Sequence, residues 1–183
     1  MTDGSGADSG AVDTGPVDPG LVDPGGLIGR LARGGATVAC AESVTGGRLV
    51  AALTSVPGSS AVVRGAVVAY ATDLKISLLG VDPGVLAAQG PVCAEVAEQM
   101  ADGVRLRLGA TWGVATTGEA GPDSASGRPV GTVHVAAAGP SGIRTRLIEL
   151  SGDREQIQGA AVVAALQLLG EVVDAGHRSQ VGS

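Results

Sequence analysis

The sequence predicts a three-layer α/β/α sandwich built around a mixed β-sheet. Short apolar runs rich in Val and Ala alternate with segments of helical periodicity, which is the order expected of an α/β fold. Glycine and proline separate most of these segments. Two late strand-like runs flank Gly139-Pro140-Ser141-Gly142, which indicates a hairpin and therefore antiparallel strands beside parallel ones.

Runs of small and β-branched residues predict the strands, at residues 37–41, 61–71, 111–115, 130–138 and 143–150. Helical periodicity and capping signals predict helices over residues 27–33, 48–55, 73–79, 81–89, 94–108 and 156–173. In open sheets of this kind, ligands bind on the loops at the carboxyl ends of strands. The loops at residues 43–47 and 117–122 have that position, so we expect the site there.

The composition excludes several classes of function. Of 183 residues, 44% are apolar and 16% are charged, so the chain can bury a core. With 1% aromatic residues the core must consist of Ala, Val, Leu and Ile, and we expect Trp112 and Met100 inside it. A net charge of -6 without a basic cluster argues against nucleic acid, and the lack of a long apolar run or signal peptide argues against a membrane. Cys40 and Cys93 are isolated, which argues against metal and disulfide sites and favours the cytoplasm.

The first 25 residues form a low-complexity repeat. They can be written as five pentads, each with an Asp at its centre, and two of them end in Asp-Pro-Gly. The predicted organisation is therefore a disordered tail over residues 1–25, one domain over residues 26–175 and a flexible C-terminus over residues 176–183.

Lys75 is a candidate for proton transfer. It is the only Lys among 12 basic residues. Arg cannot give up its proton in a protein, whereas a buried Lys can. The only Tyr, Tyr70, lies five residues earlier. Chance, with Lys75 on a solvated helix face, explains the same spacing equally well.

Ser43 is a candidate nucleophile. It follows a predicted buried strand and precedes the Gly46-Gly47 turn into a helix, a position that exposes a nucleophile among backbone N–H groups. An ordinary helix cap accounts for the same Ser. Neither His134, on a predicted strand, nor His177, near the C-terminus, is a good partner, and a Ser activated by Lys needs no His.

The loop from Thr117 to Pro122 consists of small residues after a strand, so phosphate or ribose could approach its backbone. Arg154 opens the last helix, where its guanidinium suits a phosphate or carboxylate, although on local sequence alone a surface ion pair with Asp153 or Glu155 is the more common role. The chain has no Walker loop and no G-x-G-x-x-G in the right place, which disfavours a dinucleotide-binding domain.

Several short strings together make the chain resemble the CinA C-terminal domain family, the nicotinamide mononucleotide deamidases. The strings occur in the family's order over residues 27–172. They are Ala41-Glu42-Ser43-x-Thr45-Gly46-Gly47, Val56-Pro57-Gly58-Ser59-Ser60, Gly65-x-Val67-x-Ala69-Tyr70, Lys75-x-x-Leu78-Leu79-Gly80-Val81, Thr117-Gly118-x-Ala120-Gly121-Pro122, Pro129-Val130-Gly131-Thr132-Val133 and Gly152-Asp153-Arg154-Glu155.

The resemblance implies the three-layer fold and the hydrolysis of the carboxamide of nicotinamide mononucleotide to nicotinic acid mononucleotide and ammonia, without metal or cofactor. It implies that Ser43 is the nucleophile and that Tyr70 and Lys75 activate it. The implied substrate-binding residues are Thr45, Gly46, Gly47, Thr117, Gly118, Gly121 and Arg154, with Arg154 on the substrate phosphate and the Gly46 and Gly47 N–H groups on the oxyanion.

Three positions depart from the family pattern. Val44 stands where many relatives carry Cys, Cys93 replaces a common Ser at a helix start, and Glu119 replaces a small apolar residue and adds a negative charge. Larger relatives carry an extra N-terminal domain, whose pyrophosphatase activity is not expected here.

Two other functions stay open at this stage. One is a non-catalytic nucleotide-binding or competence-related partner-binding module, and the other is a general amidase that also acts on free nicotinamide. The expected partner is a small nucleotide substrate, with neither nucleic acid nor a membrane, and an Ala/Val-faced domain of this size is compatible with homo-oligomers.

Overall fold

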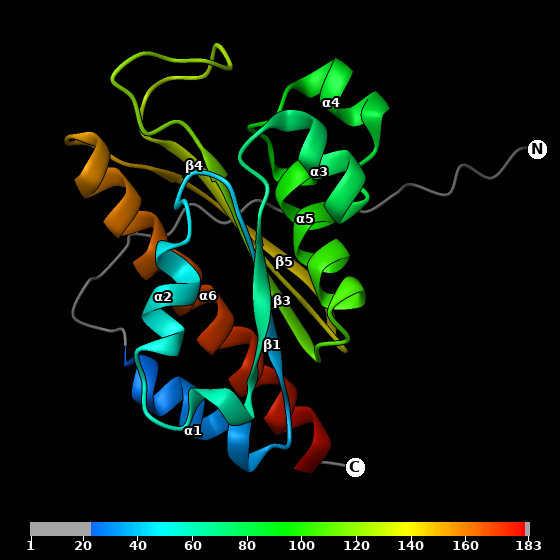
Figure 1. Ribbon diagram of the computed structural model, residues 1–183. Helices are drawn as coiled ribbons and strands as arrows, with labels where there is room; N and C mark the ends of the chain where they lie inside the picture. The colour runs from blue at the N-terminus through cyan, green and yellow to red at the C-terminus, as the bar shows by residue number, and fades with distance from the viewer. Residues whose placement is uncertain (1–22, 182–183) are drawn as a thin grey trace, which may run out of the picture.

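The computed structural model describes residues 23–181, which form a five-stranded sheet covered by helices on both faces (Figure 1). The strands are β1 (Val38–Glu42), β2 (Val63–Val68), β3 (Trp112–Gly118), β4 (Thr132–Gly139) and β5 (Gly142–Glu149). The helices are α1 (Pro24–Arg33), α2 (Arg48–Thr54), α3 (Thr72–Leu79), α4 (Pro83–Gln89), α5 (Ala94–Arg107) and α6 (Arg154–Val181), with a short 3₁₀ turn, η2 (Ser59–Ala61).

The sheet is mixed, as the sequence predicts. Its strand order is β2-β1-β3-β4-β5. β1 lies parallel to β2 and β3, while β4 is antiparallel to β3 and β5 is antiparallel to β4. β4 and β5 pair from Thr132 opposite Glu149 to Gly139 opposite Gly142, so the predicted hairpin is confirmed. The parallel strands β2, β1 and β3 therefore end at one edge of the sheet.

Each face of the sheet buries its own apolar core. Helices α1, α2 and α6 cover one face, and α3, α4 and α5 cover the other (Figure 1). Both cores consist almost entirely of Ala, Val, Leu and Ile. Trp112 is buried in the first core, which lies under α1, α2 and α6. Met100 is buried in the second core, which lies under α3, α4 and α5, and both placements are as expected from the composition. The three-layer α/β/α class is thus confirmed.

Several element ends differ from the sequence-based expectations. The expected strand over residues 61–71 is shorter, because η2 occupies Ser59–Ala61 and β2 ends at Val68. The first helix begins earlier, at Pro24, since a Pro is tolerated in the first helical turn. The last helix runs to Val181, past residue 175 where we expected the domain to end. Of the predicted tail over residues 1–25, residues 1–22 lie outside the described residues, and Pro24 and Gly25 belong to the first turn of α1.

Helix α6 is long and apolar. Within the described residues it is the one helix whose length and hydropathy, over Arg154–Gly176, would allow a membrane crossing. Half of its most apolar window is buried inside the protein, and its apolar residues pack in the first core. That packing is typical of the core helix of an α/β domain.

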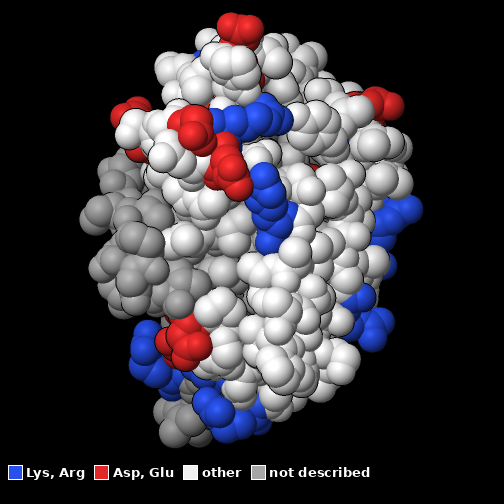
Figure 2. All heavy atoms as spheres, turned by 60° about the vertical axis from the view of Figure 1, so that its left-hand side comes forward, with Lys and Arg blue, Asp and Glu red and all other residues white. Residues whose placement is uncertain are grey.

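The face shown in Figure 2 carries charges of both signs. Lys and Arg side chains lie among Asp and Glu side chains and many uncharged residues, and on the described atoms of this face neither sign forms a broad patch. Broad basic surfaces are the usual footprint of nucleic-acid binding. This face does not have that character.

Candidate active site

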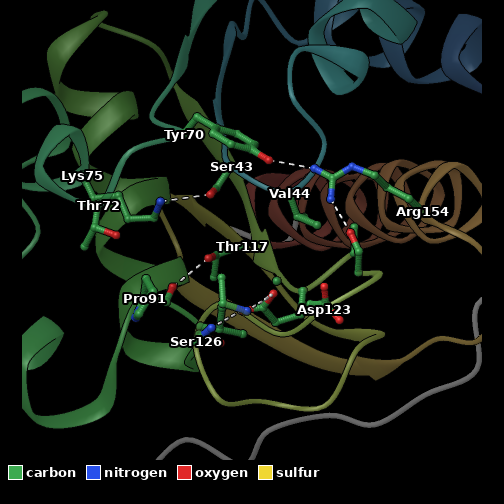
Figure 3. Close-up of a pocket in the computed structure, with 16 residues that line it drawn as sticks. Ser43, Val44, Tyr70, Thr72, Lys75, Pro91, Thr117, Asp123, Ser126 and Arg154 are labelled. Atoms are coloured by element: carbon green, nitrogen blue, oxygen red, sulfur yellow. Dashed lines mark hydrogen bonds between the residues drawn. The ribbon is translucent and has the colours of Figure 1, made fainter.

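A cavity of about 250 Å³ opens at the edge of the sheet where β1 and β3 end (Figure 3). Both loops that the sequence marks as candidate ligand loops reach it. Further walls come from the residues after β2, from the turn before α5 and from the start of α6. The residues that line the cavity are Ser43, Val44, Tyr70, Thr72, Lys75, Pro91, Val92, Thr117, Gly118, Glu119, Ala120, Gly121, Asp123, Ala125, Ser126 and Arg154.

Ser43 lies directly after β1 at the floor of this cavity. Its N–H donates to the Thr116 carbonyl at 3.0 Å, which extends the pairing of β1 with β3 by one residue. The chain then turns towards α2. Ser43 is half-buried, and its hydroxyl reaches the cavity from a backbone held by the sheet.

Lys75 comes from the first half of α3 and is 1% exposed. Its Nζ donates to Ser43 Oγ at 2.9 Å (Figure 3). The same Nζ donates to the Ala69 carbonyl at 2.8 Å. Burial lowers the pKa of Lys75 from 10.5 to about 8, because the charged ammonium loses its hydration. Near pH 8 much of the Lys75 population is therefore a neutral amine, whose lone pair can accept the Ser43 proton.

Glu42, which the sequence analysis did not single out, organises the turn after Ser43. It is fully buried at the end of β1. Its Oε1 accepts the Val50 N–H at 2.8 Å, and its Oε2 accepts the N–H groups of Gly47 and Leu49 at 2.8 and 3.0 Å. A carboxylate at this place satisfies the free N–H groups of the first turn of α2 and matches the positive end of its dipole. An acid that ends a buried strand just before a helix is the signal that could have revealed it.

The structure places Thr45, Gly46 and Gly47 outside the cavity lining, contrary to the expectation from the resemblance. The Thr45 hydroxyl donates to Glu42 Oε2 at 2.7 Å, and the Gly46 N–H donates to the Ser43 carbonyl at 3.2 Å. The Gly47 N–H is bound to Glu42. Both glycines have a positive φ, 58° and 100°, so the turn itself requires them. Their N–H groups therefore hold the turn and are not free for an oxyanion.

The backbone N–H of Val44 is another candidate donor to an oxyanion. Val44 lines the cavity next to Ser43. Among the hydrogen bonds of the described residues, neither the Val44 N–H nor the Thr45 N–H has an acceptor. The N–H of the residue after a serine nucleophile is a common oxyanion donor in hydrolases. The geometry thus favours Val44 over Gly46 and Gly47 for that role.

Tyr70 and Arg154 form a bridge across the cavity mouth. Tyr70 is 61% exposed, and its hydroxyl accepts from Arg154 Nη2 at 2.7 Å (Figure 3). Arg154 Nη1 donates to the Gly121 carbonyl at 2.6 Å. Among the hydrogen bonds of residues 23–181, none joins Tyr70 to Ser43 or Lys75, so a proton relay through Tyr70 has no support in this geometry. The backbone carbonyl of Ala69 faces Lys75, whereas the Tyr70 side chain is exposed at the cavity mouth.

Arg154 owes its position to the cap of α6. The Asp153 N–H donates to Gln156 Oε1 at 2.8 Å, and the Gln156 N–H donates to Asp153 Oδ1 at 2.9 Å. This reciprocal pair is a capping box that fixes the first turn of the helix. Arg154 keeps further N–H donors that the bridge to Tyr70 does not use, and these can face an anion.

The end of β3 contributes Thr117 and Gly118 to the cavity lining, and the loop after it contributes Gly121, as expected. Thr117 is buried, and its hydroxyl donates to the Pro91 carbonyl at 2.7 Å, which ties β3 to the turn before α5. Gly118 is required by packing, because a Cβ there would lie 2.7 Å from the Thr132 carbonyl oxygen. These residues shape the wall of the cavity.

Glu119 braces the outer part of the same loop. It is buried, and its Oε1 and Oε2 accept the N–H groups of Ser126 and Ala125 at 2.6 and 3.3 Å. Both of those residues line the cavity. The Glu119 carboxylate, which adds the negative charge noted in the sequence, thus accepts hydrogen bonds from two backbone N–H groups of the loop.

Within the described residues no group of three His, Cys, Asp or Glu side chains could hold a metal ion. His134 lies buried on β4 opposite Thr117 and Leu147, and burial together with nearby Arg128 lowers its pKa. It does not line the cavity, and the side chain of His177 lies outside the described part of the chain. The side chain that contacts the Ser43 hydroxyl is thus the amine of Lys75.

Taken together, a β-strand ends in a serine whose hydroxyl is paired with a buried lysine, in an α/β sandwich with a mixed sheet. The family model of the CinA C-terminal domain matches residues 26–173. The chain belongs to the CinA C-terminal domain family.

Relatives and solved structures agree with this assignment. A CinA-like protein of Frankia casuarinae is 54% identical over 78% of this chain and 33% of its own length, and one of Gloeobacter violaceus is 50% identical over 76% and 33%. The chain thus spans about a third of the length of these curated relatives. The competence/damage inducible protein CihA of Agrobacterium tumefaciens is 37% identical with a TM-score of 0.76, over 84% of this chain and 96% of that one. A CinA superfamily protein of Klebsiella pneumoniae 700603 is 31% identical with a TM-score of 0.78, over 84% and 99%.

Proposed function

We propose that the protein hydrolyses the carboxamide of nicotinamide mononucleotide, giving nicotinic acid mononucleotide and ammonia. The observation that carries the proposal is the hydrogen bond of 2.9 Å between Lys75 Nζ and Ser43 Oγ at the floor of the cavity. A serine needs a base to attack an amide, and a buried lysine whose pKa is about 8 is a suitable one.

The first half of the reaction forms an acyl-enzyme. Neutral Lys75 takes the Ser43 proton, and Ser43 Oγ bonds to the amide carbon. The carbonyl oxygen becomes an oxyanion, which the Val44 N–H stabilises by roughly 3 kcal/mol, the usual value for one such donor. Lys75 then passes its proton to the leaving nitrogen, the carbon–nitrogen bond breaks, and ammonia departs.

The second half releases the acid. Lys75 is neutral again and takes a proton from water, whose oxygen attacks the ester carbon. The oxyanion forms a second time, the bond to Ser43 Oγ breaks, and Lys75 returns the proton to Ser43. The carbonyl oxygen of Ala69, which accepts from Lys75 Nζ at 2.8 Å, keeps the amine in place through both halves.

Arg154 is the candidate for the substrate phosphate. It stands at the cavity mouth, and its planar guanidinium can bind two phosphate oxygens at once. Binding there would compete with, or add to, its present bonds to Tyr70 and Gly121. Tyr70 is then a residue that positions Arg154.

The test is ammonia release from nicotinamide mononucleotide by the purified protein, beside free nicotinamide and the Ser43→Ala variant. The proposal expects release from the nucleotide alone, with loss in the variant. Release from free nicotinamide as well would indicate a general amidase. Saturable nucleotide binding without ammonia release would instead support the non-catalytic module.

A further inference from the structure

Gln158 joins α6 to the turn that carries Ser43. Its Nε2 donates to the Val44 carbonyl at 2.9 Å, and its Oε1 accepts from Arg48 Nε at 3.1 Å. Gln158 is buried and lies one helical turn after Arg154 on the same side of α6. An arginine Nε is only a donor, so the Arg48 contact requires the amide oxygen on its side and leaves the amide nitrogen to face Val44.

This contact and one hydrogen bond of the turn together fix the backbone on both sides of Val44. In a trans peptide the C=O and the following N–H point in opposite directions. The Val44 carbonyl is held towards α6 by Gln158, so the Thr45 N–H points away from α6. The preceding peptide is held through its Ser43 carbonyl, which accepts the Gly46 N–H at 3.2 Å, so the Val44 N–H points away from that bond.

The N–H groups of Val44 and Thr45 are unusual because both are unpaired in the described part of the chain. Val44 is 4% exposed and Thr45 is 0% exposed, yet within the described residues neither N–H has an acceptor. Most buried backbone N–H groups are paired. A donor left unpaired beside a nucleophile is what an oxyanion site requires before the substrate arrives.

We propose that Gln158 is a positioning residue that holds the Val44 backbone in the orientation needed to receive the oxyanion formed at Ser43. The proposal rests on the proposed acyl transfer, because it concerns the oxyanion of that reaction. Without the bond from Gln158, the Val44–Thr45 peptide can rotate, and the bond from Gly46 to the Ser43 carbonyl alone then holds the turn that directs the Val44 N–H. Arg48 assists by setting which end of the Gln158 amide faces the turn.

The variant that tests this is Gln158→Glu. It keeps the length of the side chain and an oxygen for Arg48, but it places an acceptor where the Val44 carbonyl needs a donor. We expect kcat for nicotinamide mononucleotide to fall about ten-fold or more, since loss of one oxyanion donor costs roughly 10²–10³-fold and a misdirected donor costs part of that. We expect KM to change less than about two-fold, because the ground-state amide gains little from the donor.

The matched control is Gln99→Glu. Gln99 lies on α5, its Oε1 accepts the Asp82 N–H at 2.7 Å, and it does not line the cavity. It therefore also uses a helical amide to hold a neighbouring backbone segment. The control should keep the wild-type kcat and KM. Thermal unfolding of each variant shows whether the change in activity follows a change in stability.

A second readout does not depend on the substrate. A fluorophosphonate reacts with an activated serine: the Ser43 oxygen bonds to phosphorus, fluoride leaves, and Lys75 takes the proton. The phosphoryl oxygen of the adduct then occupies the oxyanion position. We expect the labelling rate to fall about ten-fold in Gln158→Glu and to stay unchanged in Gln99→Glu.

These two readouts separate the proposals. If the wild type is labelled at Ser43 but releases no ammonia from the nucleotide, the proposed function fails, and the labelling rates alone decide the role of Gln158. Wild-type labelling and wild-type kcat in Gln158→Glu, even with a lower melting temperature, would show that Gln158 only packs α6 against α2 and would overturn the inference. A wild type that neither reacts nor turns over would overturn both.

Discussion

At the scale of single residues, Lys75 places an amine with a lowered pKa against a hydroxyl. Because its pKa is about 8 in the folded protein, the base form increases as pH rises through that value. We therefore expect kcat/KM for nicotinamide mononucleotide to rise about ten-fold for each pH unit below the pKa and to level off above it. A profile of initial rates between pH 6 and pH 9.5 measures this directly. A flat profile across pH 8 would rule out Lys75 as the base.

Lys75→Arg separates charge from proton transfer. Arg keeps the positive charge but does not lose a proton at any pH where the protein is folded. We expect turnover to fall to the level of Ser43→Ala, with nucleotide binding, measured by calorimetry, largely kept. Near-normal kcat in Lys75→Arg would remove the lysine from the mechanism.

Sequence reasoning located some of these residues and missed others. Lys75 stands out because a chain that uses Arg for its other basic positions keeps one Lys, and Ser43 stands out by its place between a buried strand and a glycine turn. The role of Tyr70 beside Lys75 was what the family resemblance implied, whereas in the structure the Tyr70 hydroxyl is bound to Arg154, a contact over 84 residues that no local pattern announces. Gln158 gave no local signal, since its contact with Val44 spans 114 residues.

At the scale of elements, the start of α2 depends on one carboxylate. Glu42 accepts three backbone N–H groups and the Thr45 hydroxyl, all in or beside the first turn of that helix. Glu42→Gln replaces one oxygen by an NH₂ that faces donors. We expect it to lower the free energy of unfolding by about 2–4 kcal/mol, the usual cost of leaving buried donors without a charged acceptor, and to lower kcat because Ser43 begins the same turn.

Urea denaturation compares Glu42→Gln with Glu149→Gln, whose side chain is exposed at the end of β5. The control should change the free energy of unfolding by no more than about 0.5 kcal/mol. Equal stability of the two variants would show that α2 does not need the carboxylate.

Element types were more predictable than element ends. The five strands and six α-helices of the described residues follow apolar periodicity and the glycine or proline breaks between segments. The ends depend on tertiary contacts. Glu42 extends β1 by one residue because β3 pairs beside it, and β3 continues to Gly118 because β4 pairs with it there. No local pattern in either strand contains that information.

At the scale of the whole molecule, the buried amine costs stability. The Lys75 pKa is about 8 in the folded protein and 10.5 in its ordinary environment. Well below pH 8 both states are protonated and the cost of burying the charge is complete, roughly 3 kcal/mol for a shift of this size. Between pH 8 and 10.5 the unfolded state binds more protons than the folded state, so the free energy of unfolding rises with pH.

Lys75→Met removes this dependence while filling the same space. We expect the free energy of unfolding of the variant, minus that of the wild type, to fall by about 2–3 kcal/mol between pH 7 and pH 10.5. Loss of the bonds to Ser43 and Ala69 offsets part of the gain in stability at every pH, so the test is how the difference between the two proteins changes with pH, and not its value at one pH.

Lys75 is the only lysine, and the other groups that titrate in this range occur in both proteins, so their contributions cancel in the difference. Trp112, the single tryptophan and a buried part of the core, reports unfolding by its fluorescence in urea. Parallel stability curves for the two proteins would mean that Lys75 is not buried as a charge, and the chemistry assigned to its amine would lose its physical basis.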